Sequence, residues 1–199
     1  EAEEAAKYGA VPGDSKFADL NGDHTINGED MTVIGNALPK FTYSWNTTVS
    51  YKNWDLNLLF NGVQGNDIWN FTRATMNTGY VPTDVAVLDR WSPANENSGY
   101  PEFSNSNRNE EQSDRWLENG SYLRLSNLTL GYTFNQLKRN TFVQEAKLYV
   151  SAQNLFTITK YSGYNPESNT SGSSDTAFGY DASGYPAIRS FMVGVKFAF

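Results

Sequence analysis

Residues 41–51 read FTYSWNTTVSY, and residues 53–63, which follow after a single lysine, read NWDLNLLFNGV. In the first stretch large apolar residues alternate with Thr, Ser and Asn, and the second repeats this alternation from Trp54 to Phe60. A period of two places one kind of side chain on each face of a β-strand. The two stretches therefore predict a hairpin of two long strands, each with one apolar and one polar face.

The same alternation recurs three more times along the chain. In the third stretch the apolar positions change parity between Leu125 and Leu128, which predicts either a bulge or a passage between two environments. Strands of about ten residues match a tilted crossing of a lipid bilayer. The predicted strands cover residues 40–51, 53–63, 121–134, 145–157 and 188–199.

The connections between these strands alternate between short turns and long polar loops, the long ones being residues 64–120 and 158–187. This order, with aromatic residues at the strand ends, is typical of an all-β, transmembrane antiparallel β-barrel whose long loops are extracellular. Five strands cannot close a barrel, so we expect them to be part of a larger one. A soluble β-sandwich also has alternating strands and is the alternative, although its strands are usually shorter.

Composition excludes several other classes of protein. The chain has no cysteine and one histidine, His24, which leaves no basis for a zinc site or for catalysis by Cys-His or Ser-His-Asp groups. A net charge of -7 disfavours nucleic acid as a partner. The carboxylates of Glu110 and Glu111 are a candidate pair for glycoside hydrolysis, but their polar surroundings favour a solvated charge run. We therefore expect that the chain is not an enzyme.

Residues 19–30 read DLNGDHTINGED, which has the spacing of a calcium-binding loop. His24 stands where such loops usually carry glycine, and an Asx-rich turn without metal is the alternative interpretation. No long helix follows the loop, so the expected role of Ca²⁺ is structural and not that of a sensor. The predicted ligands are Asp19, Asn21, Asp23, the backbone carbonyl of Thr25, Asn27 and Asp30.

A series of motifs in a fixed order gives the chain a family resemblance. The run PGDSKFADLNGDHTINGEDMTVIGNALPKF (12–41) precedes the hairpin, and GNDIWN (65–70) follows it. Next come RWSPANENSGYP (90–101), SYLRLSNLTLGYTF (121–134) and LYVSAQNLFTITKYSGYNPE (148–167). Together they resemble the C-terminal region of SusC/RagA-type TonB-dependent outer-membrane transporters, over nearly the whole chain.

The resemblance implies a barrel of about 22 strands in the bacterial outer membrane, of which these five would be the last. It further implies a plug and remaining strands outside this chain, a SusD-like surface lipoprotein, and energy from the TonB complex. The implied function is active import of an oligosaccharide or a peptide. Residues 1–39 would be an extracellular loop segment, and the final strand, ending in Phe199, resembles the signal that directs barrel proteins into the membrane. The alternative is a soluble, calcium-stabilised β-sandwich for adhesion or glycan binding.

The loop 64–120 is rich in aromatic residues among polar ones. Flat aromatic faces beside polar side chains suit contacts with sugars, peptides or another protein. Packing within the loop or contact with the lipoprotein is the first expectation, and direct substrate contact the second. The candidate contact residues are Trp69, Trp91, Tyr100 and Trp116.

Overall fold

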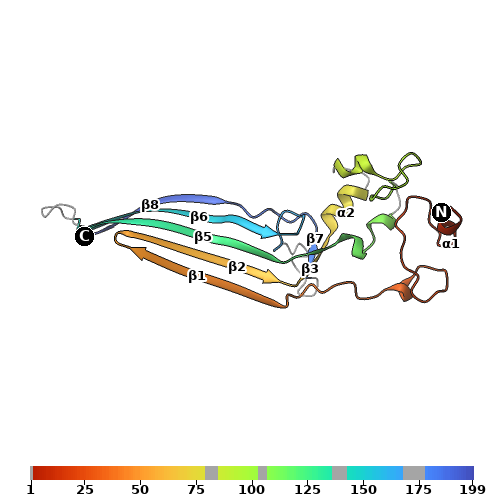
Figure 1. Ribbon diagram of the computed structural model, residues 1–199, viewed down its shortest axis with the longest axis horizontal. Helices are drawn as coiled ribbons and strands as arrows, with labels where there is room; N and C mark the ends of the chain where they lie inside the picture. The colour runs from red at the N-terminus through yellow and green to blue at the C-terminus, as the bar shows by residue number, and fades with distance from the viewer. Residues whose placement is uncertain (1, 79–84, 103–106, 136–142, 168–177) are drawn as a thin grey trace. The chain divides into compact units, whose positions relative to one another are not determined.

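The computed structural model of the 199-residue chain describes residues 2–78, 85–102, 107–135, 143–167 and 178–199. Its five long strands form one antiparallel sheet in the order β1-β2-β5-β6-β8 (Figure 1). Each strand begins and ends within two residues of the range expected from the alternation. They are β1 (Phe41–Tyr51), β2 (Trp54–Gln64), β5 (Tyr122–Asn135), β6 (Glu145–Thr159) and β8 (Ser190–Ala198).

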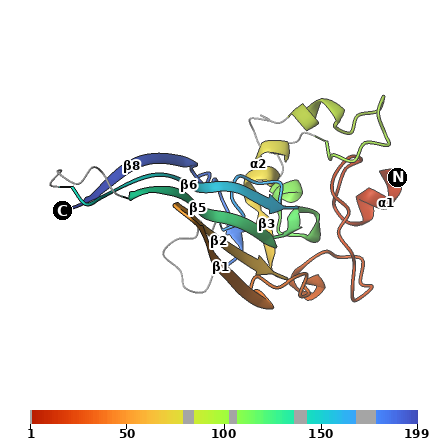
Figure 2. The same ribbon diagram turned by 60° about the vertical axis from the view of Figure 1, so that its left-hand side comes forward.

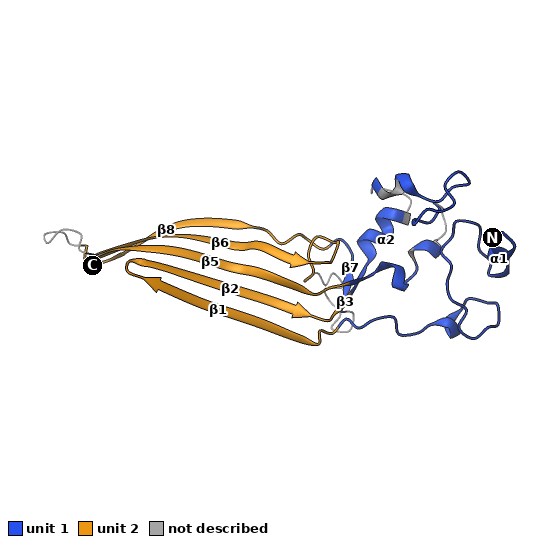
Figure 3. Cartoon of the chain, in the orientation of Figure 1, with its two compact units in different colours: residues 1–37, 68–118, 169–183 blue, residues 38–67, 119–168, 184–199 orange. Residues whose placement is uncertain are grey.

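The chain divides into two compact units (Figure 3). The sheet unit comprises Leu38–Asp67, Asn119–Ser168 and Gly184–Phe199, and the loop unit comprises Glu1–Ala37, Ile68–Glu118 and Asn169–Ser183. In the sheet unit, the β1–β2 turn lies at the same end of the sheet as the last residues of β5 and the first residues of β6, and residues 136–142 lie outside the described residues. The strands bend and twist together, as is general for β-sheets (Figure 2).

Short elements occupy the long connections that the sequence predicted only as loops. A second, three-stranded sheet has the order β4-β3-β7. None of the helices within the described part of the chain is long and apolar enough to cross a membrane. The elements are α1 (Ala2–Lys7), η1 (Gly28–Asp30), β3 (Asp67–Asn70), α2 (Phe71–Thr78), η2 (Val85–Asp89), η3 (Asn107–Glu110), η4 (Asp114–Trp116), β4 (Leu117–Asn119) and β7 (Tyr180–Asp181).

Helix α2 begins where Asn70 ends β3. The Asn70 side chain accepts a hydrogen bond from the Arg73 backbone N–H at 2.9 Å, which is the usual arrangement at a helix N-cap. Asn70 also donates to Glu118 at 3.2 Å and is almost fully buried. The asparagine at the end of the GNDIWN motif thus starts the helix and joins it to the β4 region.

Strand β5 contains a bulge at Ser126. Leu125 pairs with Phe60 of β2 whereas Asn127 pairs with Leu59, so Ser126 is an extra residue in the register. Because of this insertion, the apolar residues before and after Ser126 lie on the same face of the sheet. Of the two explanations that the sequence left open for the change in parity, the bulge is confirmed.

One face of the five-stranded sheet is apolar from edge to edge. The register places Val49, Leu56, Leu130, Val150 and Val193 in a single row across the strands. Most of this row is solvent-exposed, with Val49 at 56% and Val193 at 69%. Water-soluble monomers rarely expose an apolar surface that extends across a whole sheet.

The opposite face carries a network of hydrogen bonds between short polar side chains. Asn57 donates to Thr48 on β1 at 3.0 Å, and Thr129 and Ser151 share a hydrogen bond of 3.0 Å between β5 and β6. Asn127 joins these two parts, since it donates to Asn57 at 3.4 Å and accepts from Ser151 at 3.2 Å. The polar side chains of four adjacent strands therefore satisfy one another.

Gly131 allows an ion pair to form across a strand on this polar face. Lys147 of β6 lies 2.7 Å from Asp55 of β2, although β5 runs between them. A Cβ atom on Gly131 would lie 2.5 Å from the Lys147 side chain and 2.8 Å from the Asp55 carboxylate. The absence of a side chain at this position is therefore what lets the two charges meet.

Candidate functional site

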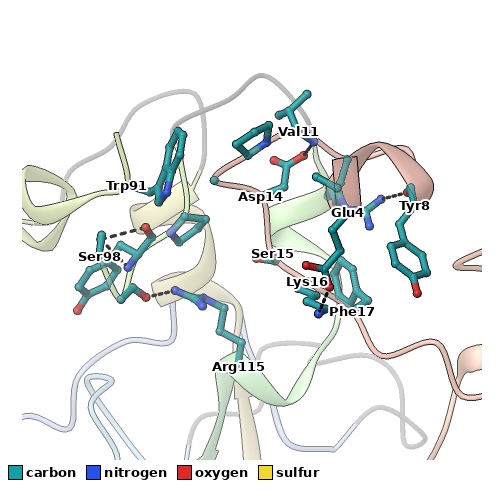
Figure 4. A pocket seen from close by; sticks show the side chains of 18 residues that line it. Glu4, Tyr8, Val11, Asp14, Ser15, Lys16, Phe17, Trp91, Ser98 and Arg115 are labelled. Carbon is teal, nitrogen blue, oxygen red and sulfur yellow. Dashed lines mark hydrogen bonds and ion pairs between the residues drawn. The ribbon is translucent and has the colours of Figure 1, made fainter. Parts of the chain in front are cut away.

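The loop unit contains a pocket of about 360 Å³ between two segments that are distant in sequence. Residues 4–17 form one wall, and residues 91–101 form the other. Figure 4 shows Trp91 and Arg115 on one side of the pocket and Lys16 and Phe17 on the opposite side. A volume in this range is sufficient for a small ligand or for one residue of a larger one.

The two walls are held together by Asn109, which is 2% exposed. Its side-chain oxygen accepts from the Ser15 backbone N–H at 2.7 Å, and its amide group donates to Asp14 at 3.2 Å and to the Glu102 carbonyl at 3.4 Å. Its backbone carbonyl accepts a hydrogen bond from the Trp116 indole at 3.1 Å. Asn109 therefore ties the wall formed by residues 4–17 to the rest of the loop unit.

The walls also meet directly at Gly13, whose φ of 97° is in the left-handed region. A Cβ atom there would lie 2.5 Å from the Trp91 ring and 2.8 Å from the Glu102 side chain. The Gly13 carbonyl accepts from the Glu102 backbone N–H at 2.7 Å. Both the backbone conformation and the close approach require glycine, the second residue of the PGD motif.

The motif RWSPANENSGYP forms a closed turn that presents two of the predicted contact residues. The Trp91 backbone N–H donates to the Tyr100 carbonyl at 2.9 Å, and the Ser98 hydroxyl donates to the same carbonyl at 3.1 Å. Trp91 and Tyr100 are both half-buried and both line the pocket. The structure thus brings these two candidates together.

The other two candidates lie elsewhere in the loop unit. Trp69 on β3 stacks with Phe71 at a ring-centroid distance of 5.5 Å and lies against Tyr180 in a tilted arrangement at 5.3 Å, and burial raises the pKa of Tyr180. Trp116 is 1% exposed and is packed inside the unit, with the Arg115 guanidinium 5.1 Å from its ring. A buried ring has no free face for a ligand. The position of Trp116 therefore fits packing within the loop, which was part of the first expectation from the sequence, and not contact with substrate.

The charges around the pocket are unequally paired. Lys16 forms an ion pair with Glu4 at 2.5 Å, which raises the pKa of Lys16 and lowers that of Glu4. Arg115 instead donates to the Gly99 carbonyl, and within the described residues it forms no ion pair with a carboxylate. Burial of its head group and the neighbouring charge of Arg73 lower the pKa of Arg115. Arg115 could not be identified from the sequence, because a single arginine in a polar run carries no local signal.

The loop 19–30 is closed by hydrogen bonds from its own backbone. Asp19 accepts from the Gly22 and His24 amides at 2.6 and 3.0 Å, and Asp23 accepts from the Thr25 amide at 2.7 Å. Further bonds involve three other predicted ligands: the Asn21 side chain accepts from Asp23 N–H, the Asn27 side chain accepts from Glu29 N–H, and Asp30 accepts from Asn27 and Leu20 N–H groups. These bonds from Asn27 and Leu20 lower the pKa of Asp30.

His24 adopts the left-handed conformation that this position of a calcium loop requires, with φ at 65°. In the part of the chain that the structure describes, no three or more His, Asp or Glu side chains are grouped so that they could hold a metal ion. The carboxylates bond to the loop backbone instead. Calcium binding at this loop therefore stays a prediction.

Two motifs of the sheet unit meet around Arg124, which is 4% exposed. Arg124 forms an ion pair with Glu167 and donates to Asn165 at 2.8 Å and Thr157 at 2.9 Å. Glu167 also accepts from the Tyr122 hydroxyl at 2.5 Å. The SYLRLS and YNPE motifs are thus joined by a buried arginine that could not be singled out from the sequence.

Of the carboxylate pair 110–111, Glu111 is exposed and the Glu110 side chain lies outside the described residues.

No protein-family model matches the chain. A TonB-dependent receptor of Formosa agariphila is 36% identical over 193 residues, which is 94% of this chain and 19% of that protein. The TonB-dependent receptor SusC of Bacteroides thetaiotaomicron is 27% identical over 94% of this chain and 18% of its own length. The chain thus spans about a fifth of the length of the curated relatives it matches.

Solved structures of the RagAB system have the same fold. The RagAB peptide transporter matches with a TM-score of 0.70 at 27% identity, over 82% of this chain and 17% of that one. The RagAB peptide importer in its closed-closed state gives a TM-score of 0.73 over 92% of this chain and 20% of that one, and at 23% identity this match supports the fold alone.

The fold class is that of a transmembrane antiparallel β-barrel, and the five-stranded sheet is part of its wall. The soluble sandwich is not supported, since the long strands within the described residues form one sheet. By sequence and by fold, the chain belongs to the SusC/RagA-type TonB-dependent receptors.

Proposed function

We propose that the chain is a C-terminal part of a receptor that imports a nutrient across the bacterial outer membrane with energy from the TonB complex. The observation that carries this proposal is the exposed apolar face of the sheet unit opposite a polar, hydrogen-bonded face. An apolar outer face against lipid and a polar inner face are what a barrel wall requires. The names of the relatives add TonB dependence to this argument.

The remaining strands and the plug would come from parts of the receptor other than these 199 residues. Strands β1 and β8 are the two edges of the sheet, and an edge cannot remain unpaired in a bilayer. We propose that each edge pairs with another strand, so that these five strands close a barrel of about 22. The loop unit would then be extracellular and would contact a SusD-like lipoprotein.

The proposed cargo is a peptide or an oligosaccharide. The RagAB structures are described as those of a peptide importer, and RagAB matches this chain at 27% identity. The half-buried rings of Trp91 and Tyr100 beside polar groups suit either kind of ligand. Trp69 is the third candidate for contact with cargo or with the lipoprotein. A structural Ca²⁺ in the loop 19–30 is also part of the proposal.

The test compares a strain that lacks the intact receptor with the same strain carrying it on a plasmid. Uptake of fluorescent oligopeptide and oligosaccharide mixtures is measured with and without a TonB-inactivating mutation, and membranes are fractionated in parallel. We expect the receptor in the outer membrane, with uptake of one mixture lost in both mutant strains. Recovery of the receptor in the soluble fraction, or unchanged uptake of both mixtures, would contradict the proposal.

A further inference from the structure

Three cations, Lys16, Arg108 and Arg115, and two carboxylates, Glu4 and Asp14, line the pocket of the loop unit. Arg108 donates to the Tyr8 carbonyl at 3.4 Å and lies over the Phe17 ring. The ion pair with Glu4 already neutralises Lys16, and Asp14 accepts hydrogen bonds from the Val11 backbone and from Asn109. Arg115 forms no ion pair within the described residues. An arginine beside a like charge and without an anion gains more than a paired arginine when an anion binds.

The chemistry of a guanidinium determines which group would bind there. Its planar fork of N–H donors matches the two oxygens of a carboxylate. In this structure one edge of the fork is held by the Gly99 carbonyl and one face lies on the Trp116 ring. These two contacts fix the direction of the remaining donors, so that Arg115 is positioned before any ligand arrives.

The wall beside Arg115 is aromatic. Trp91 and Tyr100 come from the closed turn of residues 90–101, and the contact of Trp91 with Gly13 holds its ring in place. Pro12 and Pro101 also line the pocket. A flat, rigid wall next to a cation suits a ligand that has a carboxylate at one end and a flat or ring-shaped body.

We infer that this pocket binds a carboxylate-bearing part of the imported ligand, with Arg115 holding the carboxylate and Trp91 lying against the adjacent residue. The inference rests on the proposed function and names the chemical feature that the receptor selects. Two sources supply this chemistry: the C-terminal carboxylate of a peptide, and a uronate residue of an oligosaccharide. Arg115 is thus assigned as a specificity-determining residue, and neutral ligands are expected to bind more weakly.

The test uses the intact receptor purified in detergent and follows binding by titration calorimetry and by tryptophan fluorescence. One pair of probes is a hexapeptide with a free C-terminus and the same hexapeptide as its amide. The other pair is trigalacturonate and its methyl ester. We expect the acid of one pair to bind about tenfold or more tightly than its neutral counterpart, and that pair identifies the source.

Variants assign this preference to the pocket. Arg115→Gln is expected to abolish the difference between acid and neutral probe, and Arg115→Lys to reduce it while keeping the charge. Lys16→Gln is the matched control, because its charge is already balanced by Glu4, and it should leave the preference within about twofold. Thermal unfolding that matches the unmodified receptor shows that each variant is folded.

Two outcomes overturn the inference: no preference for either acid, or a preference that Arg115→Gln leaves intact. Both outcomes are measured as binding to the receptor in detergent, without TonB or a membrane potential. Failure of import in cells with normal acid binding would therefore count against the proposed function alone. Conversely, normal import with no acid preference would remove only the role of Arg115.

Discussion

One face of the sheet unit exposes a continuous row of apolar side chains, whereas the most fully buried side chains of the loop unit include asparagine and aspartate. Val193 on the sheet is 69% exposed, while Asn70, Asn109 and Asp181 are among the largest fully buried side chains of the described residues. The sheet is organised by alternation, in which each residue depends mainly on its strand neighbours and their partners. The loop unit is organised by a few polar residues that each make several bonds. This difference predicts that single substitutions affect the two units unequally.

The largest expected effect is that of Asn109→Ala in the loop unit. The substitution removes the three side-chain hydrogen bonds of Asn109, and the groups on Ser15, Asp14 and Glu102 lose this partner. We expect the folded loop unit to be destabilised by about 3 kcal/mol. Because the bonds lie within the loop unit, the loss should be local. We expect rapid amide hydrogen exchange and proteolysis in residues 4–17, with unchanged exchange in β5 and β6.

Asn95→Ala is the control for this prediction. Asn95 also lies in the loop unit, but its side-chain bonds to Asp89 are exposed, so the expected cost is below about 1 kcal/mol. If Asn109→Ala left exchange in residues 4–17 as slow as in the unmodified protein, the loop unit would not depend on this residue.

A smaller effect is expected for Gly131→Ala in the sheet unit. The added methyl group would separate Lys147 from Asp55 and crowd the polar face, at a cost of about 2 kcal/mol. In a Lys147→Ala background the same substitution should cost less, because the nearest clashing side chain is gone. The four variants of this cycle are compared by denaturant unfolding of the intact receptor in detergent.

Gly99→Ala, in the loop unit, is the control for replacing a glycine where there is room, since a Cβ atom there would meet nothing within 4 Å and its φ is not in the left-handed region. Equal costs for Gly131→Ala in both backgrounds would show that Lys147 and Gly131 are not coupled. The polar face of the sheet would then accept substitutions as readily as a solvent-exposed surface does.

The contrast between the units also explains what the sequence could predict. Strand ranges and the bulge followed from local alternation, and they agree with the structure within two residues. Asn109, in contrast, bonds to residues 94 and 95 positions away, and Arg124 bonds to Glu167 across 43 positions. A single asparagine or arginine in a polar stretch gives no sign of such distant partners. The family motifs contain Arg124 and Glu167, but only the structure shows that the two side chains meet.

The smallest expected effect concerns the loop 19–30, where a bound ion would add to bonds that already exist. Because the loop backbone donates to every predicted side-chain ligand, removal of Ca²⁺ should loosen the loop without unfolding it. At about five times its Kd, calcium would stabilise the loop by about 1 kcal/mol. We expect calcium binding to the metal-stripped receptor by titration calorimetry, slower exchange of the Thr25 amide, and loss of both in Asp23→Ala.

Glu29→Gln separates ion binding from the general effect of negative charge. Glu29 is the neighbouring carboxylate that is not among the predicted ligands, and its side chain accepts only from Asn21 in the described hydrogen bonds. Its substitution should therefore change calcium affinity by no more than a few fold. Heat of binding that persists unchanged in Asp23→Ala would show that the loop is an Asx-rich turn closed by its own backbone. In that case the left-handed His24 would be explained by the turn alone, and the loop unit would depend on buried amides and not on a metal.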